Sequence, residues 1–377
     1  MPTAPATSNL AERSLAGEVF PAGELVALLD DPGVDTLELV HQAYLVRRHH
    51  FGREVQVHVL NNAQNGRCPE DCSYCTQART SEAGIEPYAM KPAGEVLAEA
   101  QRAYEAGAHR YCMVFSGRGP SAKRTEQLAG LVRAVKQRFP ALEVCVSAGL
   151  LDEDKARVLK EAGLDRLNHN LNTSRDNYGR ICTTHTYDDR LNTLLAARQA
   201  GLSTCSGLIA GMGETAEELV EVALQLKETQ TASIPVNFLL PFEGNPLNRP
   251  QNLSPERCLR ILCLFRFSNP TADVRCAAGR EFHLRAMEPL CLQPANSIFL
   301  DGYLNGRGAG RAATYRMLRE AGYTIVSDVP LDEAEAAVAS ADEEETASRI
   351  ARLTVNGDVS TRIKDHTELR PGQPTRA

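Results

Sequence analysis

Short runs of apolar residues alternate along the chain with longer stretches in which apolar positions recur every three or four residues. The short runs are four to eight residues long, which is the length of buried strands. They predict strands at Val55–Asn61, Arg110–Ser116, Glu143–Ala148, Arg166–Leu171, Ser203–Ala210, Ile234–Leu240, Asp273–Ala278 and Ser297–Leu300.

The longer stretches predict amphipathic helices between these strands. Four stretches end in an Ala-Gly pair, at Gly107, Gly163, Gly201 and Gly322, and glycine permits the left-handed conformation that closes many helices. Helices are expected at Gly94–Glu105, Arg124–Arg138, Asp152–Glu161, Asp188–Gln199, Thr215–Thr229, Pro255–Phe267 and Glu281–Leu292, and a further one near Ala22–Arg48 flanks or plugs the strands.

Strict alternation of strands and helices implies parallel strands joined by crossover helices. Eight units over roughly 250 residues match an α/β fold of the (β/α)8 TIM-type barrel class. Two doubly wound sheets are the alternative, but no linker divides the middle of the chain. We expect a disordered N-terminal segment over 1–20, the barrel with its N-terminal helical extension over 21–327, and a poorly ordered acidic tail over 328–377.

Charge and cysteine content narrow the functional classes. The net charge of −7 argues against nucleic-acid binding. No apolar run approaches a membrane span, and residues 1–10 lack the basic and apolar regions of a secretory signal. Eleven cysteines in a chain without an export signal indicate the reducing cytoplasm and use as ligands or in catalysis.

Three of the cysteines fall in one short stretch after the first predicted strand, with the spacing C-x3-C-x2-C at Cys68, Cys72 and Cys75. A structural [4Fe–4S] cluster takes four cysteines, so three leave one iron open to a small molecule. A zinc knuckle would need a fourth ligand nearby, but the next cysteine is Cys112. A disulfide framework belongs to short secreted chains. The stretch therefore predicts a cluster with one open iron, and its spacing resembles the signature of the radical S-adenosylmethionine (SAM) enzymes.

Three more cysteines lie on separate predicted strands, at Cys112, Cys145 and Cys205, and Arg275 lies on another. If these side chains point inward, three thiols and one guanidinium group converge inside the barrel. Buried cysteine also serves as a small apolar residue, so this reading alone leaves metal binding and core packing open. The remaining cysteines are interpreted as structural: Cys182, Cys258, Cys263, Cys276, which points to the opposite face from Arg275, and Cys291.

Over about residues 20–325 the sequence resembles the biotin synthase family of radical SAM enzymes. The resemblance rests on Cys68–Cys75, Tyr111–Met113, Asn168–Ser174, Thr183–Tyr187, Cys205–Thr215, Pro235–Asn237, Val274–Arg275, Ala278–Glu281 and Ala295–Phe299. It implies a [4Fe–4S] cluster on Cys68, Cys72 and Cys75. It also implies a [2Fe–2S] cluster on Cys112, Cys145, Cys205 and Arg275, although a guanidinium group is ordinarily a poor ligand.

The resemblance also implies roles for polar residues at the strand ends. Asn170, Asn172, Arg190 and Ile209 are expected to bind SAM, and Asn168 and Asn237 the ureido ring of dethiobiotin. Many family members carry Thr-Thr after the last strand to bind the substrate carboxylate. Here Asn305-Gly306 stands nearby, and we expect the Asn305 amide and a free Gly306 N–H to take that role, or Arg307 to do so.

The implied reaction converts dethiobiotin to biotin, using a radical derived from SAM and sulfur from the second cluster. The implied partners are a flavodoxin or ferredoxin electron donor and a second copy of the chain. The rival hypotheses are a radical SAM barrel enzyme without a second cluster, and a non-enzymatic iron–sulfur or zinc protein. Iron content separates them, because two clusters hold about six irons and one holds about four.

Overall fold

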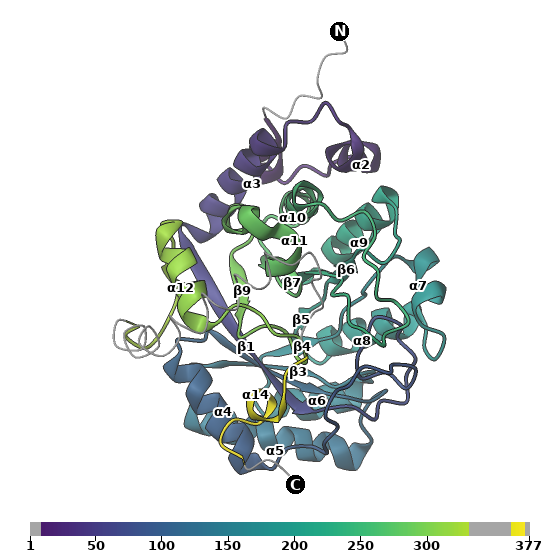
Figure 1. Ribbon diagram of the computed structural model, residues 1–377, viewed down its shortest axis with the longest axis vertical. Coiled ribbons are helices and arrows are strands. Elements are labelled where there is room, and N and C mark those ends of the chain that lie inside the picture. Colours follow the sequence, from purple (N-terminus) through teal and green to yellow (C-terminus); the bar gives the residue numbers. More distant parts are fainter. Residues whose placement is uncertain (1–8, 332–362, 374–377) are drawn as a thin grey trace.

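The computed structural model describes residues 9–331 and 363–373 of the chain (Figure 1). Eight neighbouring strand positions, all parallel, close into a barrel because β1 pairs with both β2 and β9. The barrel strands are β1 (Glu54–Gln64), β2 (Arg110–Phe115), β3 (Glu143–Ser147), β4 (Arg166–Asn168), β5 (Ser203–Cys205), β7 (Ser233–Phe238), β8 (Asp273–Cys276) and β9 (Ser297–Leu300). The predicted barrel is confirmed.

The fifth predicted strand, Ser203–Ala210, is divided into β5 and β6 (Leu208–Ala210). Gly207 lies at the break, where a Cβ atom would come within 1.9 Å of the carbonyl oxygen of Pro235 on β7. Only glycine lets the two backbones approach so closely. Both halves pair with β7, so the division bends the barrel wall without opening it.

The helices surround the barrel (Figure 1). They are α4 (Ala93–Glu105), α5 (Ala122–Arg138), α6 (Glu153–Glu161), α7 (Arg175–Ile181), α8 (Tyr187–Gln199), α9 (Ala216–Glu228), α10 (Pro255–Ser268), α11 (Arg280–Leu284) and the 3-10 helix η2 (Arg285–Leu292). The single helix predicted over Glu281–Leu292 is wrong. Arg285 has a φ of 52°, which ends α11, and Pro289 follows inside η2. In the described part of the chain, no helix is long and apolar enough to cross a membrane.

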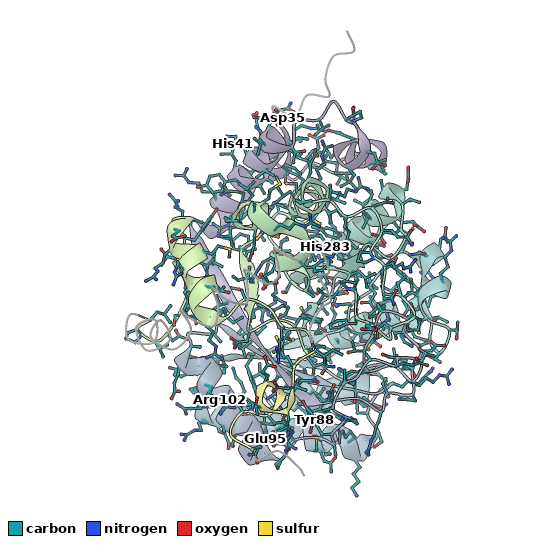
Figure 2. The ribbon with its side chains drawn as sticks, viewed as in Figure 1. Asp35, His41, Tyr88, Glu95, Arg102 and His283 are labelled. Atoms are coloured by element: carbon teal, nitrogen blue, oxygen red, sulfur yellow. The ribbon has the colours of Figure 1, made fainter. Side chains whose placement is uncertain are left out.

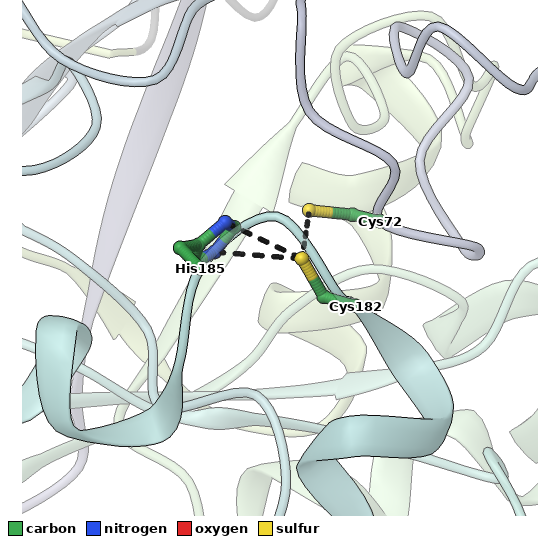
Figure 3. A group of neighbouring side chains, drawn as sticks. All are labelled: Cys72, Cys182 and His185. Atoms are coloured by element: carbon green, nitrogen blue, oxygen red, sulfur yellow. Dashed lines mark hydrogen bonds between the residues drawn. The ribbon is translucent and has the colours of Figure 1, made fainter.

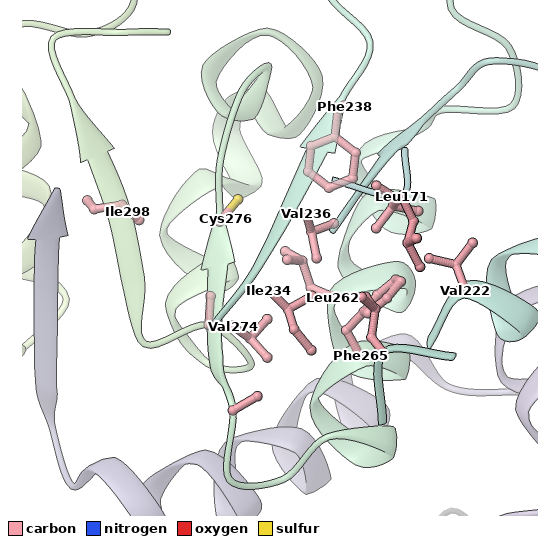
Figure 4. Packing of buried hydrophobic residues seen from close by; sticks show 14 of the residues in the cluster. Leu171, Val222, Ile234, Val236, Phe238, Leu262, Phe265, Val274, Cys276 and Ile298 are labelled. Atoms are coloured by element: carbon pink, nitrogen blue, oxygen red, sulfur yellow. The ribbon is translucent and has the colours of Figure 1, made fainter. Parts of the chain in front are cut away.

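The main core fills the space between the strands and the outer helices. Figure 4 shows Val236 of β7 and Val274 of β8 in the cluster that includes Leu262 and Phe265 of α10. Cys276 belongs to this outer core, on the face of β8 opposite to Arg275, as predicted. Every residue of β7 and β8 is buried, because side chains on one face meet the helices and those on the other fill the barrel.

The N-terminal region is more ordered than expected. Residues 9–20 were predicted to be disordered, but α1 (Leu10–Leu15) buries Leu10 and Ala11 against α3 and α10. The one helix predicted near Ala22–Arg48 is two, α2 (Ala22–Asp30) and α3 (Thr36–Phe51). The Asp35 carboxylate caps α3 by accepting hydrogen bonds from two backbone N–H groups, and Figure 2 marks its position. Residues 1–8 lie outside the described part.

After the barrel, α12 (Arg311–Glu320) leads to β10 (Thr324–Ile325), which adds to β1. Part of the predicted tail is also ordered. Residues 363–373 carry the short helix α14 (His366–Leu369) and pack beside α4. Arg370 pairs with Glu95 at 2.5 Å and lies over the ring of Tyr88, and both partners are marked in Figure 2. The rest of the predicted tail, 332–362 and 374–377, lies outside the described residues.

Charged residues at the amino ends of β2, β3 and β4 predict an acid-sensitive stability. Arg110 Nε lies 2.8 Å and Arg166 Nε 3.0 Å from Glu143 Oε2. Burial alone would raise the pKa of Glu143, but the two guanidinium groups lower it from 4.5 to about 2. Because the folded pKa lies below the unfolded one, the stabilisation is present above about pH 4.5 and is lost as the pH falls toward about 2.

We therefore expect Glu143→Gln to lower the free energy of unfolding of the cluster-free protein by about 2–3 kcal/mol at pH 7 and by less than about half of that at pH 3. Urea unfolding at the two pH values measures both. Exposed Glu126 offers the control, since Glu126→Gln is expected to change stability by less than about 0.5 kcal/mol. An equal loss at both pH values would contradict the ion-pair explanation.

Candidate functional site

A single cavity of about 250 Å³ collects the residues that the sequence analysis singled out. Its wall includes segments that follow β2, β3, β4, β7 and β9, so it opens at the carboxyl ends of the strands, where barrel enzymes carry their active sites. Gly306 and Arg307 are not in its lining. The other predicted site residues line it: Cys68, Cys72, Cys75, Cys112, Cys145, Asn168, Asn170, Asn172, Arg190, Cys205, Ile209, Asn237, Arg275 and Asn305.

The three strand cysteines, called here the barrel cysteines, meet inside the barrel. Cys112 on β2 and Cys145 on β3 are register partners, and Cys205 ends β5. All three are buried in one small cluster with Ala277 and Phe299. Hydrogen bonding with the Cys145 thiol is the main cause that lowers the pKa of Cys112 and of Cys205, and the same bonds raise the pKa of Cys145. The three thiols therefore form one hydrogen-bonded donor set, and a metal would bind them as thiolates.

Arg275 reaches the same cluster from β8. Its Nη1 lies 3.9 Å from Cys205 Sγ, and its Nη2 donates to Ser233 Oγ (2.8 Å) and Asp273 Oδ2 (3.1 Å). The guanidinium group lies over the Phe299 ring at 4.8 Å. Its buried Nε has no hydrogen-bond partner among the described residues. A buried donor without a partner beside three thiols fits a further group bound at this place.

The loop cysteines Cys68, Cys72 and Cys75 line the cavity on the segment that follows β1. None forms a disulfide, and Cys72 is buried while the others are half-buried. Burial raises the pKa of the Cys75 thiol to about 11 and also raises that of Cys68. The backbone N–H of Cys75 donates to the carbonyl of Cys72 at 3.0 Å, which folds the loop into a tight turn. Three free thiols on one loop, two of them on this turn, suit a metal centre, which would supply the charge that stabilises thiolates.

The asparagines at the end of β4 and just after it make different contacts in the cavity. Asn168 Nδ2 lies 3.3 Å from Cys205 Sγ, so this residue sits beside the barrel cysteines. The side-chain oxygen of Asn170 accepts from the Gly207 N–H at 3.2 Å. Asn172 has a φ of 70°, and its Nδ2 donates to the Tyr74 hydroxyl at 2.5 Å. Tyr74 belongs to the cysteine loop, so this bond ties the loop to the strand end.

Arg190 on α8 reaches the cavity from outside the strands. Its Nη1 donates to the Asn170 carbonyl at 2.8 Å, its Nη2 lies 2.9 Å from His185 Nε2, and its Nε donates to the Tyr178 hydroxyl. Because the N–H groups lie in the plane of the guanidinium group, these bonds fix the orientation of that plane. Ile209 on β6 forms an apolar part of the cavity wall.

Two predicted substrate residues are engaged by the protein itself. Asn237 donates to the Leu208 carbonyl at 2.9 Å and accepts from the Ala278 N–H at 3.1 Å. Asn305 donates to Asn65 Oδ1 (3.0 Å) and Thr76 Oγ1 (3.1 Å) and accepts from Asn65 Nδ2 (3.0 Å).

The expectation that Gly306 has a free N–H is wrong, because this group donates to the Tyr303 carbonyl at 2.7 Å in a tight turn. Arg307 stays a prediction for the carboxylate; its guanidinium group pairs with Asp365 and Glu368 of the C-terminal segment.

Several residues at the site escaped the sequence analysis. Tyr74 lies inside the cysteine motif, where only the cysteines drew notice. Cys182 was interpreted as structural, but its Sγ lies 3.7 Å from Cys72 Sγ. The Ser233–Asp273 pair that holds Arg275 comes from the amino ends of two strands. Asp273 and Arg275 stand two residues apart on β8, and this same-face spacing was the available signal.

Comparison with known proteins decides the family. Residues 65–226 match the Radical SAM superfamily, and residues 235–324 match the Biotin and Thiamin Synthesis associated domain. Biotin synthase from Magnetococcus marinus is 55% identical over 316 residues, covering 84% of this chain and 98% of that protein. Biotin synthase from Acaryochloris marina is 51% identical over 317 residues, covering 84% of this chain and 91% of that protein.

The chain belongs to the biotin synthase family.

Solved structures support the fold of this biotin synthase family member. The crystal structure of methylornithine synthase (PylB) superposes with a TM-score of 0.73 at 22% identity, covering 87% of this chain and 99% of that one. The FeFe-hydrogenase maturase HydG from Carboxydothermus hydrogenoformans gives a TM-score of 0.72 at 18% identity, covering 85% and 79%. At such identities the likeness establishes the barrel alone. The sequence relatives establish a radical SAM enzyme with biotin synthase function, whose family implies SAM and a [4Fe–4S] cluster.

Proposed function

We propose that this enzyme inserts sulfur into dethiobiotin with two iron–sulfur centres that face one cavity. The loop cysteines would hold a [4Fe–4S] cluster, and the barrel cysteines with Arg275 would hold a [2Fe–2S] cluster. The observation that carries the proposal is that both sets of cysteines, the asparagines after β4 and Arg190 line the same cavity. A protein that only stored or carried a cluster would have no need of polar residues around a second set of thiols.

The donor sets fit these two groups. The loop offers three cysteines and no fourth, which leaves a coordination position for SAM. The barrel set offers three buried thiols beside the partnerless Nε of Arg275. When bound, the clusters and SAM would supply a radical able to remove hydrogen from unactivated carbon, together with the sulfide to be inserted. The apolar wall formed by Ile209, Phe299 and Leu239 would exclude water from this chemistry.

Protein residues would orient the two small molecules. Asn170, Asn172, Arg190 and Ile209 would contact SAM. Asn168 stands beside Cys205 and would present its amide to the ureido ring of dethiobiotin, next to the proposed sulfur source. Asn237 has a second lone pair on its carbonyl oxygen beyond the bond to Ala278, so it can still accept from a ureido N–H. The reacting carbon would thereby be held close to the barrel cysteines.

The direct test is product analysis with SAM, a reductant and dethiobiotin on anaerobically reconstituted protein. Biotin and 5′-deoxyadenosine are the expected products, with about six irons per chain. About four irons with 5′-deoxyadenosine but no biotin would indicate a single-cluster radical SAM enzyme instead. We further propose a homodimer that receives electrons from a flavodoxin or ferredoxin. Light scattering and reduction by a purified donor test these two points.

Arg190→Lys is expected to raise the Kd for SAM by about tenfold, which corresponds to about 1.4 kcal/mol. One ammonium group cannot serve Tyr178, Asn170 and His185 together, so the strand end that carries Asn170 loses its fixed position. Equilibrium binding of SAM to the reconstituted enzyme measures the change. Arg180→Lys on the exposed side of α7 is the matched control. Equal SAM affinity in both variants would remove Arg190 from the proposed site.

Asn305→Ala is expected to lower the free energy of unfolding by about 1–3 kcal/mol, because it removes hydrogen bonds of buried Asn65 and Thr76 and leaves Asn65 Oδ1 without its donor. These bonds support a positioning role for Asn305, and its contact to the substrate carboxylate stays a prediction. Urea unfolding and dethiobiotin titration of the folded variant separate the two roles. Unchanged stability combined with dethiobiotin binding weakened about tenfold would favour the carboxylate contact.

A further inference from the structure

Cys182 is a buried thiol that the proposed reaction does not use. It follows α7 directly, and its Sγ lies 3.7 Å from Cys72 Sγ and 3.3 Å from His185 Nδ1 (Figure 3). Ligand atoms of Cys72, Cys182 and His185 all lie within 4.8 Å of one another, and the three residues are buried. This set shares only Cys72 with the loop cysteines.

The distances from Cys182 Sγ to the other two ligands are close to those of a tetrahedral metal site, and Cys72 and His185 lie within 4.8 Å of each other. With Zn–S bonds of about 2.3 Å, two thiolates on one zinc stand about 3.8 Å apart, and a thiolate and an imidazole nitrogen stand about 3.5 Å apart. The observed Cys72–Cys182 distance is 3.7 Å, and the two ring nitrogens of His185 lie 3.3 and 3.9 Å from Cys182 Sγ. Two cysteines and one histidine with a fourth open position form a known zinc ligand set.

The surroundings of His185 resemble those of a metal-binding histidine. Its Nδ1 is hydrogen-bonded to the Glu70 carboxylate, and Thr184 Oγ1 donates to the same oxygen at 2.6 Å. A carboxylate on one ring nitrogen directs the lone pair of the other outward, as in many metal sites. That nitrogen, Nε2, lies 3.9 Å from Cys182 Sγ and now accepts from Arg190. Metal binding therefore requires the imidazole to leave Arg190 and turn toward the thiols, while Arg190 keeps its bonds to Tyr178 and Asn170.

Hydrogen bonds connect the cysteine loop to the turn that carries Cys182 and His185. The carboxylate of Asp71, next to Cys72, accepts from the backbone N–H groups of Thr183 (2.9 Å) and Thr184 (3.2 Å). The Ser73 N–H donates to the Ile181 carbonyl at 2.9 Å. These bonds fasten the cysteine loop to the Cys182–His185 turn on both sides of Cys72. The segments that carry Cys72 and Cys182 are therefore held side by side without a metal.

We propose that Cys72, Cys182 and His185 bind one divalent transition metal, Zn²⁺ or Fe²⁺, in the cluster-free protein. The two thiols release their protons to solvent on binding, so two thiolates balance the charge of the cation. Because Cys72 cannot serve both centres, the mononuclear metal and the [4Fe–4S] cluster exclude each other. The exclusion rests on the proposed role of Cys72 in the cluster, whereas the metal site itself does not.

Cobalt is the probe, since tetrahedral Co²⁺ bound by thiolates absorbs strongly in the visible. Anaerobic, reduced, cluster-free wild type is titrated with Co²⁺ beside Cys182→Ala and Cys68→Ala. The barrel cysteines contribute the same background to all three proteins. We expect wild type and Cys68→Ala each to bind about one Co²⁺ at this site. Cys182→Ala should bind it more than about 100-fold more weakly, because loss of even an outer partner of a metal ligand lowers metal affinity about 10–100-fold.

The same variants then receive iron and sulfide with or without one equivalent of Zn²⁺. Zinc is expected to slow formation of the [4Fe–4S] absorption in wild type but not in Cys182→Ala. His185→Gln is the second variant should Cys182→Ala fail to fold. Identical cobalt spectra in wild type, Cys182→Ala and His185→Gln would overturn the site. Failure of wild type to assemble any cluster would instead refute the proposed function and leave the cobalt result standing.

Discussion

Cys68→Ala and Cys75→Ala are each expected to abolish reductive cleavage of SAM. Each change removes one of three thiolates on the turn after β1, and the described residues offer no further cysteine there except Cys182, which adjoins Cys72. A [4Fe–4S] cluster held by two cysteines loses both stability and its link to bound SAM. Assay of 5′-deoxyadenosine with SAM and a reductant measures the loss, which should reach the level without enzyme.

Cys258→Ala is the matched control, because Cys258 is a fully buried cysteine of α10 that does not line the cavity. It is expected to form 5′-deoxyadenosine at close to the wild-type rate. Cys72→Ala is a less clean test, since Cys182 Sγ lies 3.7 Å from the lost ligand atom. Wild-type cleavage by both Cys68→Ala and Cys75→Ala would refute the assignment of these residues to the cluster.

Cys145→Ala is expected to abolish sulfur insertion while SAM cleavage continues. Cys145 is 1% exposed and lies between Cys112 and Cys205 in the hydrogen-bonded group of barrel cysteines. Its loss should remove the second cluster while the turn after β1 stays intact. Biotin formation should then fall to background, whereas 5′-deoxyadenosine is still produced from SAM. Iron content should fall by about two per chain.

Arg275→Lys provides the graded comparison for Cys145→Ala. The lysine keeps the positive charge opposite Asp273 but loses the planar group that reaches Ser233, Asp273 and Cys205 together. Biotin yield is expected to fall less in this variant than in Cys145→Ala. If Cys145→Ala still made biotin at the wild-type yield, the barrel cysteines would not hold the sulfur source.

The barrel was predictable because its sequence pattern is local. Each strand is a short apolar run, the helices between them show apolar positions every three or four residues, and four of these stretches end in an Ala-Gly pair. Order at the ends of the chain was harder to predict. Residues 363–373 are polar, and their order depends on ion pairs with Glu95 and Arg307, which stand far away in the sequence. Composition alone cannot report such distant partners.

The part of the candidate site that depends on local sequence was also predictable. The spacing of Cys68, Cys72 and Cys75 and the strand positions of the barrel cysteines placed all of them at one cavity. Cys182 was missed because its approach to Cys72 depends on how the end of α7 packs against a loop 110 residues earlier in the chain. The free N–H expected at Gly306 was likewise taken by a turn whose closure the dipeptide itself does not reveal.

The C-terminal segment matters for how recombinant forms of this enzyme are made and interpreted. Ile363 forms a bridge with Gly306, and the Lys364 N–H donates to the Asn305 carbonyl at 2.7 Å. Removing these residues, or joining a bulky tag beside them, disturbs a turn that forms part of the cavity wall while every proposed ligand stays in place. A shortened protein with full iron content and poor turnover would therefore report a misshapen reaction chamber, not a missing catalytic group.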